Sequence, residues 1–143
     1  MTAGDKAKKM LSVDEGLRLK PYRCTAGKLT IGYGRNLDDV GISERIADEM
    51  LKEDVEVAKK TCQKIFGTLF DSWGENRQLG WINLAFNLGR TRLMQFKKTI
   101  RAAQIEDWME VEEGLRKSLW FKQVKGRAGR VIGMICHETF PYS

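Results

Sequence analysis

The most constraining feature of this sequence is a long amphipathic run from Ser43 to Phe66. Ser43 is a preferred helix N-cap and Gly67 is a preferred stop. A helix of about 23 residues, at about 1.5 Å per residue, spans roughly 35 Å. In a chain of 143 residues, we expect such a helix to link two parts of the molecule. Its apolar positions keep the three-and-four spacing of one helix face: Ala47, Met50, Leu51, Val55, Ala58, Cys62 and Ile65.

The residues before this helix predict a short helix followed by a small hairpin. Residues 5–15 form an amphipathic pattern that Asp5 can cap, and it ends at Glu15 because Gly16 breaks it. The β-type run Leu29–Tyr33 follows a turn and is interrupted and followed by glycines. Such glycines weaken a strand unless the backbone must approach another group closely. The expected inward face of the short helix consists of Ala7, Met10 and Leu11, with Leu17 beyond the break.

The residues after the long helix predict several further helices and no other strand. We expect one helix from Asp71 or Ser72 to Leu88, stopped by Gly89, and shorter ones over about 91–103, 106–117 and 126–136. Glycines at helical spacing in the last helix, Gly126, Gly129 and Gly133, predict close packing against a neighbouring helix. The expected core includes Trp108, Val111, Leu115, Leu119 and Trp120. The predicted class is α+β, with a small hairpin lobe, a connecting helix and a helical lobe.

Three polar side chains mark the hairpin as a candidate active site. Glu15 is followed after eight residues by Cys24, and Cys24 after five residues by Thr30. A carboxylate at a helix C-terminus faces the negative end of the helix dipole, which tends to raise its pKa toward the range of a general acid. An exposed Glu and a buried Cys are also common structural residues, so the spacing alone leaves both interpretations open.

Composition and charge narrow the class of protein. No apolar run approaches the ~20 residues that cross a bilayer, and the N-terminus lacks the apolar segment of a secretory signal, so we expect accumulation in the cytosol. The net charge of +6 favours a polyanionic partner, either nucleic acid or a bacterial envelope, although a merely soluble basic surface fits equally. The tryptophans fall on predicted helices, which argues against nucleic-acid binding. With three cysteines, one histidine and no CxxC spacing, we expect free thiols and no metal.

The string EGLRLKPYRCTAGKLTIGYG, from Glu15 to Gly34, closely resembles the signature of phage-type lysozymes, the endolysins related to T-even phage lysozyme. Residues 83–89 and 108–132 are similar to the helices of that family, so the resemblance covers nearly the whole chain. It implies a single lysozyme-like domain over residues 1–143 with a cleft between two lobes. The small lobe would span about 14–45, the linking helix about 43–66, and the helical lobe about 67–143 together with the N-terminal helix.

The resemblance also implies an activity and a set of residues. The family cleaves the β-1,4 bond between N-acetylmuramic acid and N-acetylglucosamine in peptidoglycan, without a cofactor. Glu15 matches the general acid, and Thr30 matches the residue that holds the water or the second catalytic group. For substrate binding, Phe86 matches a cleft-wall aromatic residue, Thr99 a hydroxyl near bound sugar, and Arg127 an arginine that pairs with the acid. We expect a monomer that acts from the host cytoplasm after release by a holin and that does not insert stably into the membrane.

Three positions depart from the family pattern. Cys24 stands where many members carry Asp, and its role as base, nucleophile or small polar spacer is open, as is inverting or retaining chemistry. The neighbouring cations Arg23 and Lys28 would lower its pKa, and Glu15 would oppose them. Arg35 replaces a usual His and is predicted to pair with Asp54, and Gly114 replaces an Asn that contacts sugar.

Two other functions compete with the muramidase interpretation. A Cys24/His137 dyad would give a thiol hydrolase, but no orienting group or oxyanion motif accompanies the pair. We expect His137 to lie on the surface after the last helix. The non-enzymatic alternative is a catalytically weak lysozyme-like protein that binds peptidoglycan, with turnover lost through the replacement of Asp by Cys.

Overall fold

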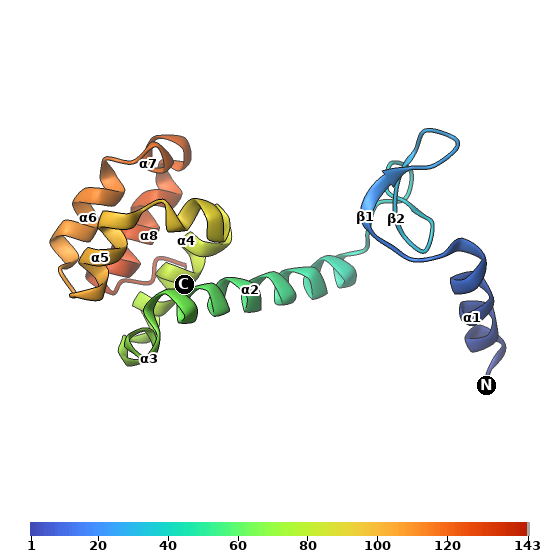
Figure 1. Ribbon diagram of the computed structural model, residues 1–143, viewed down its shortest axis with the longest axis horizontal. Coiled ribbons are helices and arrows are strands. Elements are labelled where there is room, and N and C mark those ends of the chain that lie inside the picture. Colours follow the sequence, from blue (N-terminus) through green and yellow to red (C-terminus); the bar gives the residue numbers. More distant parts are fainter. Residues whose placement is uncertain (143) are drawn as a thin grey trace. The chain divides into compact units, whose positions relative to one another are not determined.

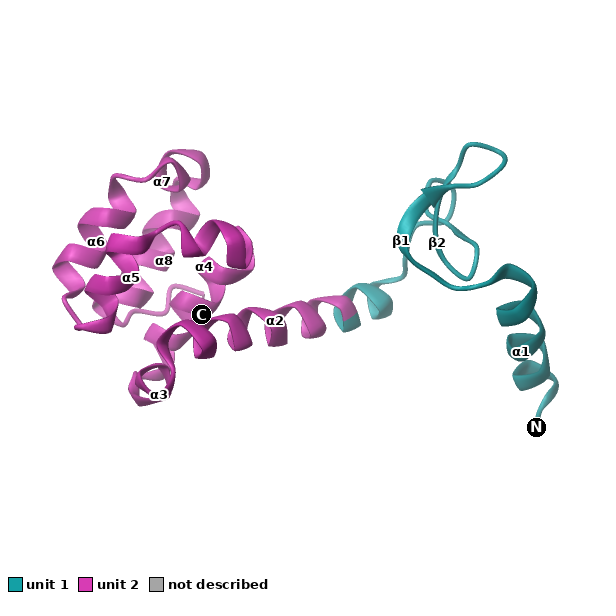
Figure 2. Ribbon diagram, in the orientation of Figure 1, with its two compact units in different colours: residues 1–49 teal, residues 50–143 magenta. Residues whose placement is uncertain are grey.

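The structure is a computed structural model that describes residues 1–142 (Figure 1). The chain divides into two compact units, Met1–Glu49 and Met50–Ser143 (Figure 2). The first unit contains a small antiparallel sheet and the second is helical, so the predicted α+β class is confirmed. The assignment of residues 1–143 to one lysozyme-like domain stays a prediction.

Unit 1 consists of one helix, a three-stranded sheet and the first residues of the long helix. The elements are α1 (Ala3–Glu15), β1 (Arg18–Arg23), β2 (Leu29–Gly32) and β3 (Arg35–Asn36). The strands are antiparallel in the order β1-β2-β3, with Thr30 of β2 opposite Tyr22 on one side and Asn36 on the other. The predicted hairpin is therefore a hairpin extended by a very short third strand.

Helix α1 begins earlier than the sequence predicts. Thr2 is the N-cap and accepts a hydrogen bond from the Asp5 backbone N–H, while the Asp5 carboxylate accepts one from the Thr2 backbone N–H. Asp5 thus completes a capping box from the third helical position instead of capping the helix itself. Within unit 1 the helix buries no side chain, so the predicted inward face has no partner in this unit.

Helix α2 (Glu44–Phe66) has the predicted bounds and crosses from unit 1 into unit 2. Ser43 caps it, because its hydroxyl accepts the Ile46 N–H at 3.2 Å. Gly67 ends it with a φ of 59°, a left-handed conformation that glycine adopts without strain. Only the C-terminal half of α2 is buried, through Ala58, Thr61, Cys62 and Phe66.

The described part of unit 2 also contains six further helices: α3 (Thr68–Ser72), α4 (Glu75–Met94), α5 (Lys97–Gln104), α6 (Trp108–Arg116), α7 (Leu119–Val124) and α8 (Gly126–His137). The helix expected to start at Asp71 or Ser72 instead starts at Glu75, since those two residues belong to α3. The expected stop at Gly89 is a kink with φ 76°, after which α4 continues to Met94. The helix expected over 91–103 is therefore divided between α4 and α5. Separate caps, Asp107 and Ser118, define α6 and α7.

The core of unit 2 is built on the contact between α4 and α8. A Cβ at Gly80 of α4 would lie 2.8 Å from the Ile135 side chain and 2.9 Å from Met134 Cβ. The close helix contact that we predicted from the glycines of α8 is therefore made by a glycine of α4. Trp81 beside it is completely buried, and its Nε1 has no hydrogen-bond partner among the residues described. Leu119, predicted to be buried, is 67% exposed.

Candidate active site

Glu15 lies at the junction of α1 and the sheet. It is the last residue of α1, its side chain is exposed, and Gly16 ends the helix with a φ of 71°. The carboxylate lies against Gly34 in the turn between β2 and β3, where an added Cβ would be 2.9 Å from Glu15 Oε2. Gly34 also has a φ of 74°. Both the missing Cβ and the left-handed backbone therefore require glycine where the carboxylate meets the turn.

Cys24 lies in the turn that joins β1 to β2 and is half-buried. Its backbone N–H donates to the Lys28 carbonyl at 3.0 Å, and its own carbonyl accepts the Gly27 N–H at 2.8 Å. The backbone N–H of Lys28, then that of Ala26, and to a smaller extent the Thr30 hydroxyl lower the pKa of the Cys24 thiol. These donors stabilise the thiolate, the form that acts as base or nucleophile.

The cause of this shift differs from the one that we predicted. Arg23 Nη1 lies 3.6 Å from an Asp38 carboxylate oxygen, and Lys28 Nζ lies 3.1 Å from one of Asp39. Both cations are thus matched by carboxylates. The pKa of Cys24 is lowered by neutral hydrogen-bond donors of its own turn instead.

Thr30 is the one buried residue of unit 1, with 3% of its surface exposed. Its hydroxyl donates to the Lys28 carbonyl at 2.8 Å and also helps to lower the pKa of the Cys24 thiol. A hydroxyl carries one proton, so it donates either to the carbonyl or to a thiolate, and its oxygen remains free to accept. The structure therefore brings Cys24, in the turn between β1 and β2, close to Thr30, in β2.

Phe86 and Arg127 line one pocket of unit 2. Its volume is about 420 Å³, and Phe86 in its wall is 41% exposed. Arg127 Nε donates to Asn83 Oδ1 at 3.0 Å, and the Asn83 amide donates to the Tyr142 hydroxyl at 3.3 Å. This network fixes one edge of the guanidinium, and within residues 1–142 no other hydrogen bond of the guanidinium is formed. The remaining lining residues are Leu51, Val55, Leu79, Ile82, Met134 and Phe140.

Thr99 does not belong to that pocket. It is buried in α5, and a Cβ at Gly114 of α6 would collide with its hydroxyl oxygen. Gly114 lines a separate pocket of about 390 Å³ together with Ser118 and Trp120. The replacement of the family Asn by Gly114 thus gives the Thr99 hydroxyl its space.

Two residues singled out in the sequence have local partners. His137 is the last residue of α8, not a residue beyond it, and its Nε2 lies 2.7 Å from Glu112 Oε1. The side chains of Arg116 and then His137 lower the pKa of Glu112. Arg35 Nη1 donates to the Gly41 carbonyl at 3.2 Å. The predicted Arg35–Asp54 pair would join the two units and stays a prediction.

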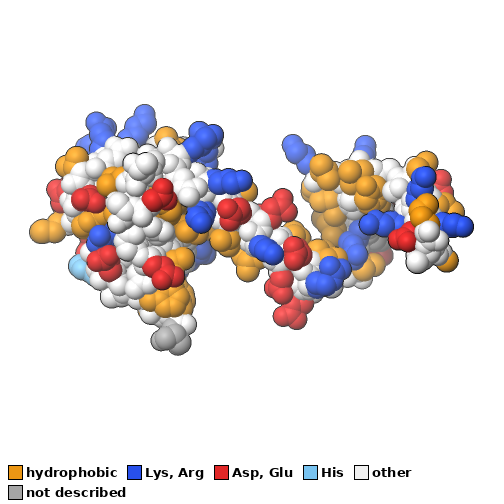
Figure 3. All heavy atoms as spheres, turned by 90° about the horizontal axis from the view of Figure 1, so that it is seen from below, with side chains coloured by type: hydrophobic (Ala, Val, Ile, Leu, Met, Phe, Trp, Pro, Cys, Tyr) orange, Lys and Arg blue, Asp and Glu red, His pale blue; other side chains and the backbone are white. Residues whose placement is uncertain are grey.

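The part of the chain described contains no cluster of side chains that could hold a metal ion. Residues 1–142 contain no group of three or more His, Cys, Asp or Glu side chains placed to hold a metal. Across the same residues, no helix combines the length and apolar character needed to cross a bilayer. On the face shown in Figure 3, Lys and Arg side chains occur on both units and are mixed with acidic ones.

Sequence reasoning missed the residues that support the site. The sequence indicates that Gly34 ends the β-type run Leu29–Tyr33. It does not predict the contact with Glu15, because that contact depends on how the end of α1 is placed against the sheet. Asn83 belongs to a quoted family string, yet its partner Arg127 lies 44 residues away. No pattern in the sequence predicts the hydrogen bond between Asn83 and Tyr142.

The chain is similar to known lysozymes along most of its length. The family model described as "Phage lysozyme" matches residues 12–136. "Probable T4-type lysozyme 1" of Dictyostelium discoideum is 26% identical over 156 residues, covering 90% of this chain and 92% of that protein. "Pre-baseplate central spike protein Gp5" of Enterobacteria phage T4 is 28% identical over 153 residues, which cover 88% of this chain but 27% of that protein. An "Endolysin" of Acyrthosiphon pisum secondary endosymbiont phage 1 is 49% identical over 45 residues, 29% of this chain and 30% of that protein.

Proposed function

Because this chain belongs to the phage lysozyme family, a family of lysozyme-type hydrolases, we propose that it is a muramidase that cleaves the β-1,4 bond between N-acetylmuramic acid and N-acetylglucosamine. The observation that carries the proposal is the arrangement in unit 1. An exposed carboxylate at a helix end faces a glycine, and a thiol with a lowered pKa lies beside a buried hydroxyl.

Glu15 is the general acid in this proposal. Cleavage of a glycosidic bond requires a carboxylic acid that protonates the leaving oxygen as the bond to the anomeric carbon breaks. Glu15 is exposed and therefore accessible to a polymeric substrate, and the missing Cβ of Gly34 leaves room for its carboxylate beside the turn. A carboxylate in the right position relative to the bond contributes to the rate through its orientation.

Cys24 and Thr30 supply the second function. In the inverting route, the thiolate takes a proton from a water that Thr30 orients, and that water attacks the anomeric carbon. In the retaining route, the thiolate itself attacks, and water later displaces it with Glu15 acting as base. In a third arrangement Cys24 is only a spacer, and Thr30 alone holds the water. The lowered pKa of Cys24 favours the two routes that use a thiolate.

Phe86 and Arg127 bind substrate in this proposal. The exposed Phe86 ring offers an apolar face to a sugar ring, and the free N–H groups of Arg127 suit a carboxylate. Thr99 provides a hydroxyl near a sugar that binds beside Gly114. The protein binds this sugar more weakly, because Gly114 lacks the side chain of the family Asn that contacts sugar.

The biological role that follows is host lysis by an endolysin released from the cytoplasm through a holin. The catalytically weak, peptidoglycan-binding protein is the second candidate, and the Cys in place of Asp at position 24 is the observation that favours it. The two candidates differ in turnover and not in binding, so an activity assay separates them.

The test is the clearing of outer-membrane-permeabilised cells by wild type, Glu15→Gln and Glu53→Gln. Glu53 is an exposed carboxylate of α2 and serves as the matched control. We expect wild type and Glu53→Gln to clear equally, and Glu15→Gln to be slower by about 100-fold or more. Equal clearing by Glu15→Gln would remove Glu15 as the acid. No clearing by wild type, with retained binding to purified peptidoglycan, would favour the binding protein.

A further inference from the structure

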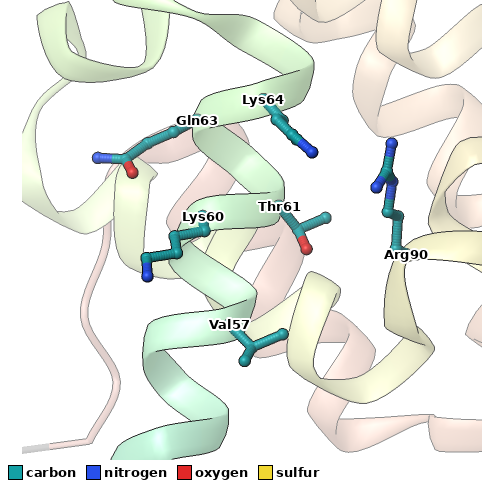
Figure 4. A pocket seen from close by; sticks show the side chains of 6 residues that line it. All are labelled: Val57, Lys60, Thr61, Gln63, Lys64 and Arg90. Carbon is teal, nitrogen blue, oxygen red and sulfur yellow. The ribbon is translucent and has the colours of Figure 1, made fainter.

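Unit 2 contains a basic pocket that none of the proposed catalytic or sugar-binding residues enters. Its volume is about 580 Å³, and it lies between the C-terminal half of α2 and the segment of α4 that follows Gly89. Figure 4 shows Thr61 and Lys64 extending from α2 toward the side on which Arg90 lies. The lining residues are Val57, Lys60, Thr61, Gln63, Lys64 and Arg90.

The positive charges of this pocket come from two elements. Lys60 and Lys64 of α2 both line it, and Figure 4 shows Lys64 extending toward the side of Arg90 and Lys60 extending away from it. Arg90 adds a third cation because the left-handed Gly89, with φ 76°, redirects α4 just before it. A lysine near the end of α2 is stabilised by the helix dipole, but that dipole does not account for an arginine of α4.

These cations have no carboxylate partner among residues 1–142. The ion pairs of the described residues involve Arg23, Lys28, Arg77, Arg116, Lys117 and His137, and none involves a residue of this pocket. Thr61 is 9% exposed and Gln63 is half-buried, so neutral donors accompany the charges. The pocket therefore combines cations, neutral donors and no acid in its lining, which suits an anion.

We propose that this pocket binds the free carboxylates of the peptide stems of peptidoglycan. The inference rests on the proposed function, because it assumes that the glycan strand lies at Phe86. Arg90 follows Phe86 by four residues, so their Cα atoms are at most about 14 Å apart. A peptide stem of about four residues spans a similar length. One stem can therefore reach the pocket while its sugar is bound.

The pocket contributes to recognition of the substrate and not to the chemical step. Its contacts are made by groups remote from the glycosidic bond, so they are expected to be equally strong before and during bond cleavage. Such uniform binding lowers KM and leaves kcat unchanged. Because the cations are exposed, the contribution also falls as the salt concentration rises.

The test compares Lys64→Gln/Arg90→Gln with Lys59→Gln/Arg101→Gln. The control removes one lysine of α2 and one arginine of α5, both exposed and outside the pocket. We expect the pocket variant to raise KM on stem-bearing peptidoglycan about tenfold with kcat within about twofold, as expected for two solvent-exposed ion pairs. The control is expected to change KM by less than about twofold.

Two modified substrates identify the carboxylate as the ligand. On glycan strands stripped of stems by an amidase, and on peptidoglycan whose carboxylates have been converted to amides, we expect both double variants to match wild type. A defect of the pocket variant that persists on these substrates, a defect equal to that of the control, or no defect at all would overturn the proposal. Competition by inorganic phosphate, with no loss of binding on amidation, would assign the pocket to phosphate and would also overturn it.

A binding assay keeps this test independent of catalysis. Co-sedimentation of Glu15→Gln with purified peptidoglycan measures affinity without turnover, and the pocket substitutions are introduced into that background. We expect the pocket variant to bind peptidoglycan about tenfold more weakly than Glu15→Gln alone. The affinity of the control variant is expected to stay within about twofold of that of Glu15→Gln alone. Absent turnover by wild type would contradict the muramidase proposal, whereas unchanged sedimentation would contradict the pocket alone.

Discussion

The two units of this protein are ordered by different forces. In unit 1 only Thr30 is buried, and α1 buries no side chain. Its geometry comes from turn hydrogen bonds, glycines with positive φ and exposed ion pairs such as Lys28–Asp39. Unit 2 is held by an apolar core that runs from Phe66 through Trp81 to Ile135.

Because of this difference, the candidate catalytic residues lie in one unit and most of the stabilising core lies in the other. Among the candidate catalytic groups, Glu15 is exposed and Cys24 is half-buried, in a unit whose backbone is shaped by hydrogen bonds. Among the candidate substrate-binding residues, Phe86 and Arg127 line a pocket of a well-packed helical unit that resists deformation. Substitutions in unit 2 are therefore expected to change stability most, and small substitutions in unit 1 to change activity most.

The largest effect on stability is expected in unit 2 from Trp81→Ala. The side chain is completely buried against Phe66 and Trp73, with ring centroids 4.8 Å and 6.2 Å away. Large-to-small substitutions of aromatic core residues cost about 3–5 kcal/mol. Because its Nε1 has no hydrogen-bond partner within residues 1–142, the loss of that buried donor offsets part of the cost, and we expect about 3 kcal/mol. Urea unfolding followed by circular dichroism measures the change.

Met109→Ala is the control for this substitution, since Met109 is 86% exposed. We expect its free energy of unfolding to stay within about 0.5 kcal/mol of wild type. A loss below about 1 kcal/mol for Trp81→Ala would show that the core of unit 2 does not dominate stability.

The next effect is expected in unit 1 from Gly34→Ala. The new methyl group would lie 2.9 Å from Glu15 Oε2 and would displace the carboxylate. A displacement of about 1 Å reduces the rate about 100-fold. Gly27→Ala is a matched control, because Gly27 has a similar φ, 76°, but no atom within 4 Å of an added Cβ. Both variants carry the same backbone strain of about 1–2 kcal/mol, and only Gly34→Ala is expected to lose activity. Equal turnover of the two variants would contradict the positioning role of Gly34.

A smaller effect concerns the reactivity of the three thiols. Burial raises the pKa of Cys62 and Cys136 to about 12, whereas the hydrogen bonds described above lower that of Cys24. The thiolate fraction of Cys24 therefore increases at lower pH than that of a free thiol. We expect iodoacetamide to label one cysteine in the folded protein, with a pH midpoint below that of a free cysteine, as measured by mass spectrometry. Labelling of Cys62 or Cys136 at the same rate would contradict this order.

The activity of labelled protein and of Cys24→Ser then separates the mechanisms. If Cys24 acts as a thiolate, alkylation abolishes turnover and Cys24→Ser is strongly impaired. Full activity of Cys24→Ser would make Cys24 a spacer and assign the second function to Thr30 and its water. A retaining or inverting product distinguishes the two thiolate routes.

Local signals in the sequence predicted much of this structure. The bounds of α2 follow from Ser43, Gly67 and an unbroken amphipathic period, which depend only on neighbouring residues. The grouping of Cys24 with Thr30 also follows locally, because a tight turn between paired strands places them together. The predicted start of α1 at Asp5 was wrong, because Thr2 is the N-cap and Asp5 completes the capping box from within the helix.

Features that depend on distant contacts were not predictable in this way. No sequence pattern marks Gly80 as a helix contact. Its role as the position where α8 packs closely against α4 is evident only from the structure. The predicted stop at Gly89 is a kink, since tertiary packing allows α4 to resume after one residue. Because that kink sets the position of Arg90, sequence patterns could not predict the basic pocket either.

The most direct test of the central claim identifies the sugar at the new reducing ends. Purified peptidoglycan is digested with wild type or Glu15→Gln, the products are reduced with borohydride, and the sugar alcohols are determined by mass spectrometry. A muramidase releases reducing N-acetylmuramic acid, so we expect its alcohol to increase with wild type and to stay near background with Glu15→Gln. Reduced N-acetylglucosamine as the main product, or an equal yield from Glu15→Gln, would contradict the account.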